Sequence, residues 1–146
     1  VPDSSVSPFH KTVNMRLPLI TRGMGLAYLA FTPKEEFDLI VGMLRNSEEP
    51  EDELARHPER LDRLVQVTRE RGYALRSPQV EPRNSNTIAV PVFNDNDRVV
   101  ASLGLTYFTS AFPSQNDACD RYAPVLKTAS DEISKDLARL NKSSLI

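Results

Sequence analysis

Two adjacent segments of alternating residues constrain the fold most strongly, Thr87 to Phe93 and Arg98 to Tyr107. Alternation of this kind is typical of strands, whose successive side chains point to opposite faces of a sheet. The four residues between the segments are Asn94-Asp95-Asn96-Asp97, and both residue types suit a tight turn. The sequence therefore predicts an antiparallel β-hairpin.

The two faces of this hairpin differ in their side chains. One face carries large apolar residues, among them Ile88, Val90, Leu103 and Leu105. The other carries small or hydroxylated residues, namely Thr87, Ala89, Pro91, Ser102, Gly104 and Thr106. Alternation alone fits a sheet with one face in water equally well. A solvated face usually carries Lys, Glu or Arg, and this one carries none, so the alternative is half of a ligand cup with room for a bound molecule.

Helical patterns precede the hairpin. Gly23-Met24-Gly25 opens an apolar stretch through Phe31 that should form a buried helix. Thr32-Pro33-Lys34-Glu35 predicts a capping box, with proline at the first position of a second helix. The core stripe of that helix follows helical spacing: Phe37, Ile40, Val41 and Leu44.

A third helix is predicted over Pro58 to Arg71, ending at Gly72. Asn46 to Glu53 reads as an acidic connection, and Ser77 to Asn86 as a polar loop. We also expect a short strand over Phe9 to Arg16.

The final element is a long amphipathic helix from about Ser114, with Asp117 three residues later. Pro124 should either start it or bend it. The fold class expected from these elements is α+β, an antiparallel sheet flanked by helices.

Composition excludes several functions. The 146 residues fit one domain, and the 18 basic and 20 acidic side chains form no dense basic patch for nucleic acid. A single cysteine and two distant histidines, His10 and His57, offer no metal cluster, and no nucleophile elbow or phosphate loop is present. Cys119 lies near Asp117 and Asp120, whose charges disfavour a reactive thiolate. We expect a cytoplasmic protein without membrane contact, cofactor, metal or catalytic residue.

The start of the first helix is a second candidate binding feature. Glycines at Gly23 and Gly25 expose backbone N–H groups at the positive end of the helix dipole, which suits a carboxylate. Glycines in that position are more often simple turn residues.

Four blocks in order resemble the effector-binding domain of the IclR family of transcription regulators. They are Arg16 to Pro33, Arg71 to Ala74, Ser85 to Val92 with Asp97 to Leu103, and Tyr122 to Leu126 through Ser134. The resemblance implies a GAF-like fold over residues 1–146. It also implies that a winged helix-turn-helix DNA-binding domain is absent from this chain, together with the first helix and leading strands of the sensing domain. The missing initiator methionine suggests such a fragment as well.

Members of this family work as dimers or tetramers, and a small organic acid changes their promoter occupancy. DNA would be contacted only through the absent domain. Carried over by position, the contacts of the family's small-acid sensors fall on Val6, Phe9, Gly23, Met24, Thr87, Gly104 and Thr106. An acidic pocket residue of those sensors aligns with Ser77, and a cysteine and a serine align with Thr87 and Gly104, so the ligand need not be the same.

Phe9-His10 and the Arg16 to Leu19 run resemble the branch that regulates hydroxyphenylpropionate and related aromatic-acid catabolism. The expected effector is therefore an aromatic carboxylate, with Arg22 as a charge partner and the loop Ser77 to Asn86 ordered on binding. The predicted effector-binding residues are Phe9, Gly23, Met24, Tyr28, Thr87, Ser102, Gly104 and Thr106. The alternatives are a small hydrolase or isomerase, and a dimerisation module with a vestigial pocket.

Overall fold

The computed structural model describes residues 17–144, and the predicted strand over Phe9 to Arg16 lies outside them. The described elements are helix α1 (Gly23–Phe31), α2 (Lys34–Arg45), the 3₁₀ helix η1 (Pro50–Arg56), α3 (Pro58–Arg71), strands β1 (Ala74–Leu75), β2 (Ser85–Phe93) and β3 (Val99–Phe108), the 3₁₀ turn η2 (Thr109–Ala111) and α4 (Gln115–Ser144).

The predicted hairpin is confirmed, and it forms most of a three-stranded antiparallel sheet in the order β1-β2-β3. Its register places small residues directly opposite one another: Thr87 and Thr106, Ala89 and Gly104, Pro91 and Ser102. Asp97 closes the turn with a φ of 58°, a conformation that Asp tolerates better than most residues. Asn94 Oδ1 accepts hydrogen bonds from the backbone N–H groups of Asn96 and Arg98.

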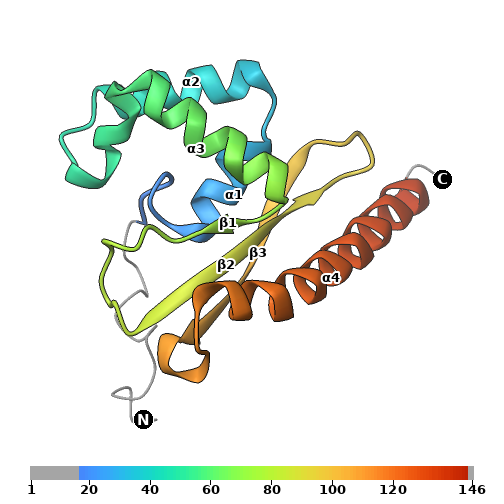
Figure 1. Ribbon diagram of the computed structural model, residues 1–146. Coiled ribbons are helices and arrows are strands. Elements are labelled where there is room, and N and C mark those ends of the chain that lie inside the picture. Colours follow the sequence, from blue (N-terminus) through green and yellow to red (C-terminus); the bar gives the residue numbers. More distant parts are fainter. Residues whose placement is uncertain (1–16, 145–146) are drawn as a thin grey trace, which may run out of the picture.

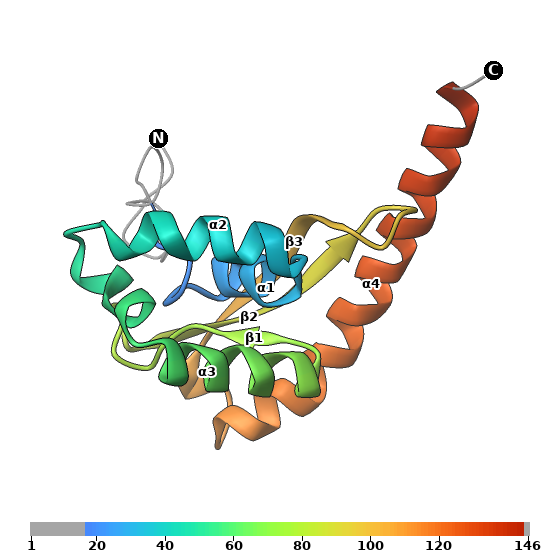
Figure 2. The same cartoon turned by 90° about the horizontal axis from the view of Figure 1, so that it is seen from above.

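The sheet lies between two helices (Figure 1). Helix α4 packs on the large apolar face, where Ile88 and Val90 contact Ala118, Cys119 and Leu126. Helix α1 packs on the small face, and α2 and α3 lie outside α1, around a second core that includes Leu29, Val41, Leu44, Leu61 and Val65. The C-terminal part of α4 extends beyond the sheet (Figure 2). The α+β prediction is therefore confirmed.

Local signals set several boundaries as expected. Helix α3 has the predicted limits, and Gly72 ends it with a φ of 85° while its N–H donates to Thr68 O. At the start of α4, Ser114 Oγ accepts from Asp117 N at 3.2 Å and donates to the Asp117 carboxylate at 2.8 Å.

Three expectations were wrong. The N-cap of α2 is Pro33 in place of the predicted Thr32, so the helix starts one residue later than expected, and the hydroxyl of Thr32 donates to Glu36 and forms no capping box with Glu35. A 3₁₀ helix, η1, begins inside the acidic connection and runs beyond it to Arg56. Helix α4 does not start at Pro124 but runs through it as one helix, with Ala118 and Leu126 on either side of Pro124 both packed in the core against the sheet.

Candidate ligand-binding site

Helix α1 lies very close to the small face of the sheet. A Cβ atom on Gly104 would lie 2.8 Å from Met24 Cγ, and one on Gly23 would lie 3.1 Å from Thr87 Cγ2. Small residues on β2 and β3 therefore admit a helix, with packing closer than larger side chains would allow. The face is neither fully solvated nor an empty cup, since α1 covers part of it.

The β3 side of this contact stays partly open in the described part of the chain. Strand β3 is the last in the sheet order, and Ser102, Gly104 and Thr106 are all half-buried. Met24 is 42% exposed above them. A small molecule could reach this region from the β3 side, whereas the β2 side is closed by Leu26, Ala27 and Ala89.

Two hydroxyl groups meet at this region. Thr87 Oγ1 and Thr106 Oγ1 lie 2.8 Å apart, in a pair in which either can donate. Each hydroxyl has a further lone pair, so the pair can still interact with a bound polar group. Gly23 brings the N-terminus of α1 directly against Thr87.

The residues at the N-terminus of α1 do little to offset the partial positive charge of the helix start. Arg22 is the N-cap residue and makes no side-chain capping bond, and the first turn holds no acidic residue. The first N–H groups of a helix have no partner within the helix and carry partial positive charge. This end of α1 is therefore suited to an anion.

Glu51, from η1, is the carboxylate closest to this end in the described interactions. It accepts from Thr21 Oγ1 at 2.6 Å, and its contact with Arg22 Nη2 is long, at 3.5 Å. Arg22 Nε is buried without a hydrogen-bond partner. Arg22 is thus only partly satisfied by Glu51.

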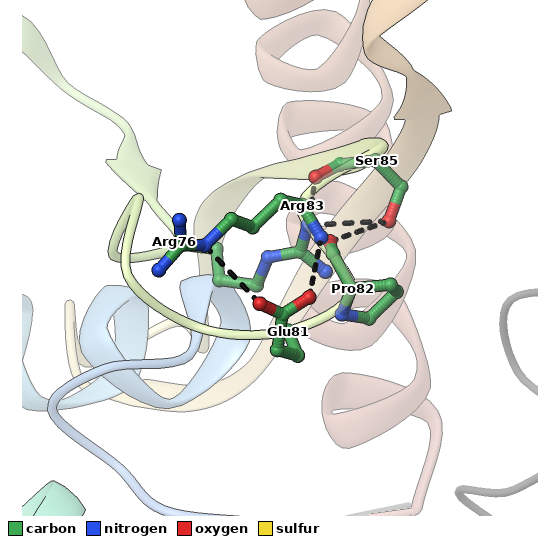
Figure 3. A network of polar contacts seen from close by, with 5 residues as sticks. All are labelled: Arg76, Glu81, Pro82, Arg83 and Ser85. Carbon is green, nitrogen blue, oxygen red and sulfur yellow. Dashed lines mark hydrogen bonds and ion pairs between the residues drawn. The ribbon is translucent and has the colours of Figure 1, made fainter.

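A second guanidinium lies nearby on Arg76, which is 8% exposed. Its Nη2 donates to Pro82 O at 2.8 Å, to Ser85 Oγ at 3.2 Å and to Ser85 O (Figure 3). Burial, and then the charge of Arg22, lower the pKa of Arg76. The guanidinium groups of Arg22 and Arg76 therefore both contribute positive charge near the start of α1.

Arg76 also fixes the loop between β1 and β2. Figure 3 shows its guanidinium inside that loop, with Glu81 bonded to Arg83 on the outside. The N–H of Ser77 donates to Thr21 O at 2.8 Å, which ties the loop to the segment ahead of α1. Arg76 and Ser77 thus hold the two ends of the loop in place.

Tyr28 follows Met24 by one helical turn, so the two lie on the same side of α1. Its hydroxyl donates to Glu36 Oε1 at 2.5 Å, and Thr32 Oγ1 donates to Glu36 Oε2 at 2.8 Å. The bond to Glu36, aided by burial, raises the pKa of Tyr28. The Tyr28 hydroxyl is therefore committed to joining α1 to α2, and its ring alone remains for a ligand.

The predicted residues divide into three groups. The structure brings together Gly23, Met24, Thr87, Gly104 and Thr106. Ser102 and Tyr28 lie farther along β3 and α1, and Phe9 and Val6 lie outside the described residues. Sequence reasoning missed Arg76 and Glu51, because neither belongs to a recognisable motif.

The described residues give little support for a metal site or a catalytic site. Within residues 17–144 no three His, Cys, Asp or Glu side chains are grouped to hold a metal ion. Cys119, on α4, is 3% exposed in the core between this helix and the sheet. His57 is exposed and faces Glu53 at 3.9 Å. None of these residues forms an acid–base or nucleophilic pair at the α1 end of the sheet.

Comparison with known proteins identifies the class. Residues 7–135 match the family described as "Bacterial transcriptional regulator IclR C-terminal". The chain therefore belongs to the IclR family of bacterial transcriptional regulators and contains its C-terminal domain. The members of this family are transcriptional regulators and not enzymes, in agreement with the expectation of a non-enzymatic protein.

Individual relatives agree. The chain is 31% identical over 101 residues to the HTH-type transcriptional regulator XynR of Escherichia coli (strain K12), which covers 69% of this chain and 39% of that protein. The C-terminal domain of the E. coli regulator KdgR has a TM-score of 0.66 at 26% identity, over 85% of this chain and 73% of that one. The Thermotoga maritima IclR structure has a TM-score of 0.67 at 25% identity, over 85% and 49%. The chain thus spans about two fifths of the length of its curated relative.

No helix within the described residues is both long enough and apolar enough to cross a membrane.

Proposed function

We propose that this domain senses a small organic acid, whose carboxylate binds at the N-terminus of α1 against the Thr87 and Thr106 hydroxyls. The observation that carries the proposal is the contact of Gly23 with Thr87, which joins an uncapped helix start to a hydroxyl pair. Arg22 supplies the nearest full positive charge. A carboxylate in this position would receive backbone, hydroxyl and guanidinium donors together.

Glu51 would compete with the effector carboxylate for Arg22. Its carboxylate accepts a hydrogen bond from the Thr21 hydroxyl and makes the long contact with Arg22. An effector carboxylate would replace Glu51 at Arg22, with a better geometry than 3.5 Å. Effector binding would thereby loosen η1 from the segment ahead of α1.

The apolar part of the effector would lie on the β3 side. Met24 and the ring of Tyr28 line this side along α1, and Phe9 is a proposed third wall. Gly104 stands where the family's small-acid sensors have serine, and the flexible Met24 side chain that packs against it would turn aside for a ligand larger than a short keto acid. We therefore favour an aromatic carboxylate, as in the aromatic-acid catabolism branch of the family.

The consequences for the whole regulator belong to the same proposal. We infer a cytoplasmic homodimer or homotetramer that contacts DNA through a winged helix-turn-helix domain. Effector binding would change the populations of two oligomer geometries, because it favours the one in which the acid binds more tightly.

Thermal unfolding with a panel of phenylpropionates, benzoates and short keto acids tests the proposal. A ligand that binds only the folded state raises the melting temperature. We expect a rise with at least one aromatic acid and a smaller rise with keto acids. The absence of a shift with every acid would favour the remaining alternative, a dimerisation module with a vestigial pocket.

A further inference from the structure

A hollow lies where the segment ahead of α1 meets the end of α2 and η1. Its volume is about 340 Å³, within the range of small-molecule sites. Its lining combines hydrocarbon side chains with two carboxylates: Leu17, Pro18, Leu19, Leu44, Glu49 and Asp52. None of the predicted effector residues lines this hollow.

Asp52 is the unusual member of the lining, because it is 3% exposed and only half satisfied. Its Oδ2 accepts a hydrogen bond from Ser47 Oγ at 2.7 Å. Its Oδ1 is buried and has no hydrogen-bond partner. An ionised carboxylate oxygen in this state lacks the donors that water would supply, so a cationic or donor group beside it would be strongly favoured.

The nearby arginines do not supply that group. Arg45 Nε donates to Ala55 O at 3.1 Å, and Arg56 Nη1 donates to Ser47 O at 2.9 Å. Both guanidiniums therefore serve backbone carbonyls. Within residues 17–144, no basic side chain forms an ion pair with Asp52.

We propose that this hollow, named here the Asp52 hollow, binds a small organic cation, with an ammonium group at Asp52 and Glu49 and an apolar body against Leu17, Leu19 and Leu44. The ammonium would supply the donor that Oδ1 lacks. Since Oδ1 has no contact with solvent, binding requires the Asp52 carboxylate to turn toward the hollow.

The lining residues favour an organic cation over other classes of ligand. Two carboxylates disfavour an anion. A metal ion would need several oxygen, nitrogen or sulfur ligands, and four of the six lining side chains are hydrocarbon. An apolar body joined to an ammonium matches both parts of the wall.

Titration of the 146-residue chain with benzylammonium, followed calorimetrically and by the methyl NMR signals of Leu17 and Leu44, tests the proposal. We expect saturable binding with shifts at both leucines. Benzyl alcohol, a neutral analogue of similar shape, should bind at least tenfold more weakly. Equal binding of the two, or no binding of benzylammonium, would overturn the proposal, as would magnesium binding at Asp52 in its place.

Substitutions test whether benzylammonium binds at Asp52. Asp52→Asn should weaken benzylammonium at least tenfold, whereas Asp62→Asn on the exposed surface of α3 should leave it unchanged. Leu17→Lys is the second variant, because it keeps Asp52 and places a like charge at the exposed wall. It should also weaken binding. Unchanged affinity in Leu17→Lys and in a folded Asp52→Asn variant would contradict the proposal, and because these titrations contain no acid, that outcome is distinguishable from a failure of acid binding at α1.

Discussion

Thr87 and Thr106 stand directly opposite each other on β2 and β3, with their hydroxyl oxygens 2.8 Å apart. Each hydroxyl is half-buried, and the pair lies against the first residue of α1. In the absence of a ligand the two groups satisfy each other. The same pair can present a donor and lone pairs to a ligand without leaving a buried polar group alone.

This relationship predicts a non-additive double-mutant cycle. Thr87→Val or Thr106→Val alone should lower the free energy of unfolding by about 0.5–1.5 kcal/mol, because the remaining hydroxyl loses its partner. The double variant should lose less than the sum, since no unpaired hydroxyl remains. Chemical denaturation measures all three, with the exposed Thr128→Val as control. Strict additivity would show that the hydroxyls do not interact.

Two glycines should respond to alanine in opposite directions. A Cβ on Gly25 would lie 2.6 Å from the backbone of Leu19, which cannot move away as a side chain can. Gly25→Ala should therefore destabilise the domain by about 1–3 kcal/mol. Gly42, inside α2, has nothing within 4 Å, so Gly42→Ala should stabilise it by about 0.5–1 kcal/mol. Denaturation midpoints of the two variants distinguish close packing from helix propensity, and a stabilising Gly25→Ala would contradict the packing of Leu19 on α1.

Arg76 should control the loop between β1 and β2. Arg76→Met keeps much of the apolar stem but removes every donor to Pro82 and Ser85. We expect faster amide hydrogen exchange in residues 77–84 and a loss of about 1–3 kcal/mol of stability. Arg83→Met, in the exposed pair with Glu81, should cost at most about 1 kcal/mol. Equal exchange in the two variants would show that Arg76 does not hold the loop.

Expectations from the sequence were most accurate where a local signal sets the structure. Gly72 ends α3 because its positive φ suits glycine, and Ser114 with Asp117 starts α4 through two reciprocal hydrogen bonds. Alternation identified the two faces of the hairpin but not what covers them. The close packing of Met24 over Gly104 and the continuity of α4 through Pro124 depend on tertiary contacts.

The same contrast applies to the candidate site. Gly23, Thr87, Gly104 and Thr106 could be named from a helix start and a small face. Glu51 and Arg76 could not, because they reach the site from a 3₁₀ helix and a loop whose positions no local pattern sets.

Glu51 provides a test of competition. Removing its charge by Glu51→Gln should free Arg22 and raise the affinity for 3-phenylpropionate by up to about fivefold, the factor that corresponds to the ~1 kcal/mol upper value for a partly exposed ion pair. Glu53→Gln, in the same 3₁₀ helix but exposed, should not change it. Calorimetric titration measures both. A weaker affinity in Glu51→Gln would contradict competition at Arg22.

Glu36 should contribute to the loss of folding stability at low pH. Hydrogen bonds from Tyr28 and then Thr32 hold the pKa of Glu36 below its usual value of 4.5. A carboxyl group with a lowered folded-state pKa stabilises the fold above 4.5, and this contribution is lost as the pH falls through the folded-state value. Glu36→Gln should therefore show a shallower loss of stability below pH 4.5 than the wild type. Denaturation between pH 3 and 7 measures it, and parallel profiles would exclude this coupling.

A crystal structure with the acid that most raises the melting temperature would show directly whether its carboxylate binds at the start of α1. We expect a carboxylate within hydrogen-bond distance of the Gly23 or Met24 N–H and of the Thr87 or Thr106 hydroxyl, with Glu51 displaced from Arg22. A carboxylate bound elsewhere, with the Thr87–Thr106 pair and the Arg22–Glu51 contact unchanged, would contradict it.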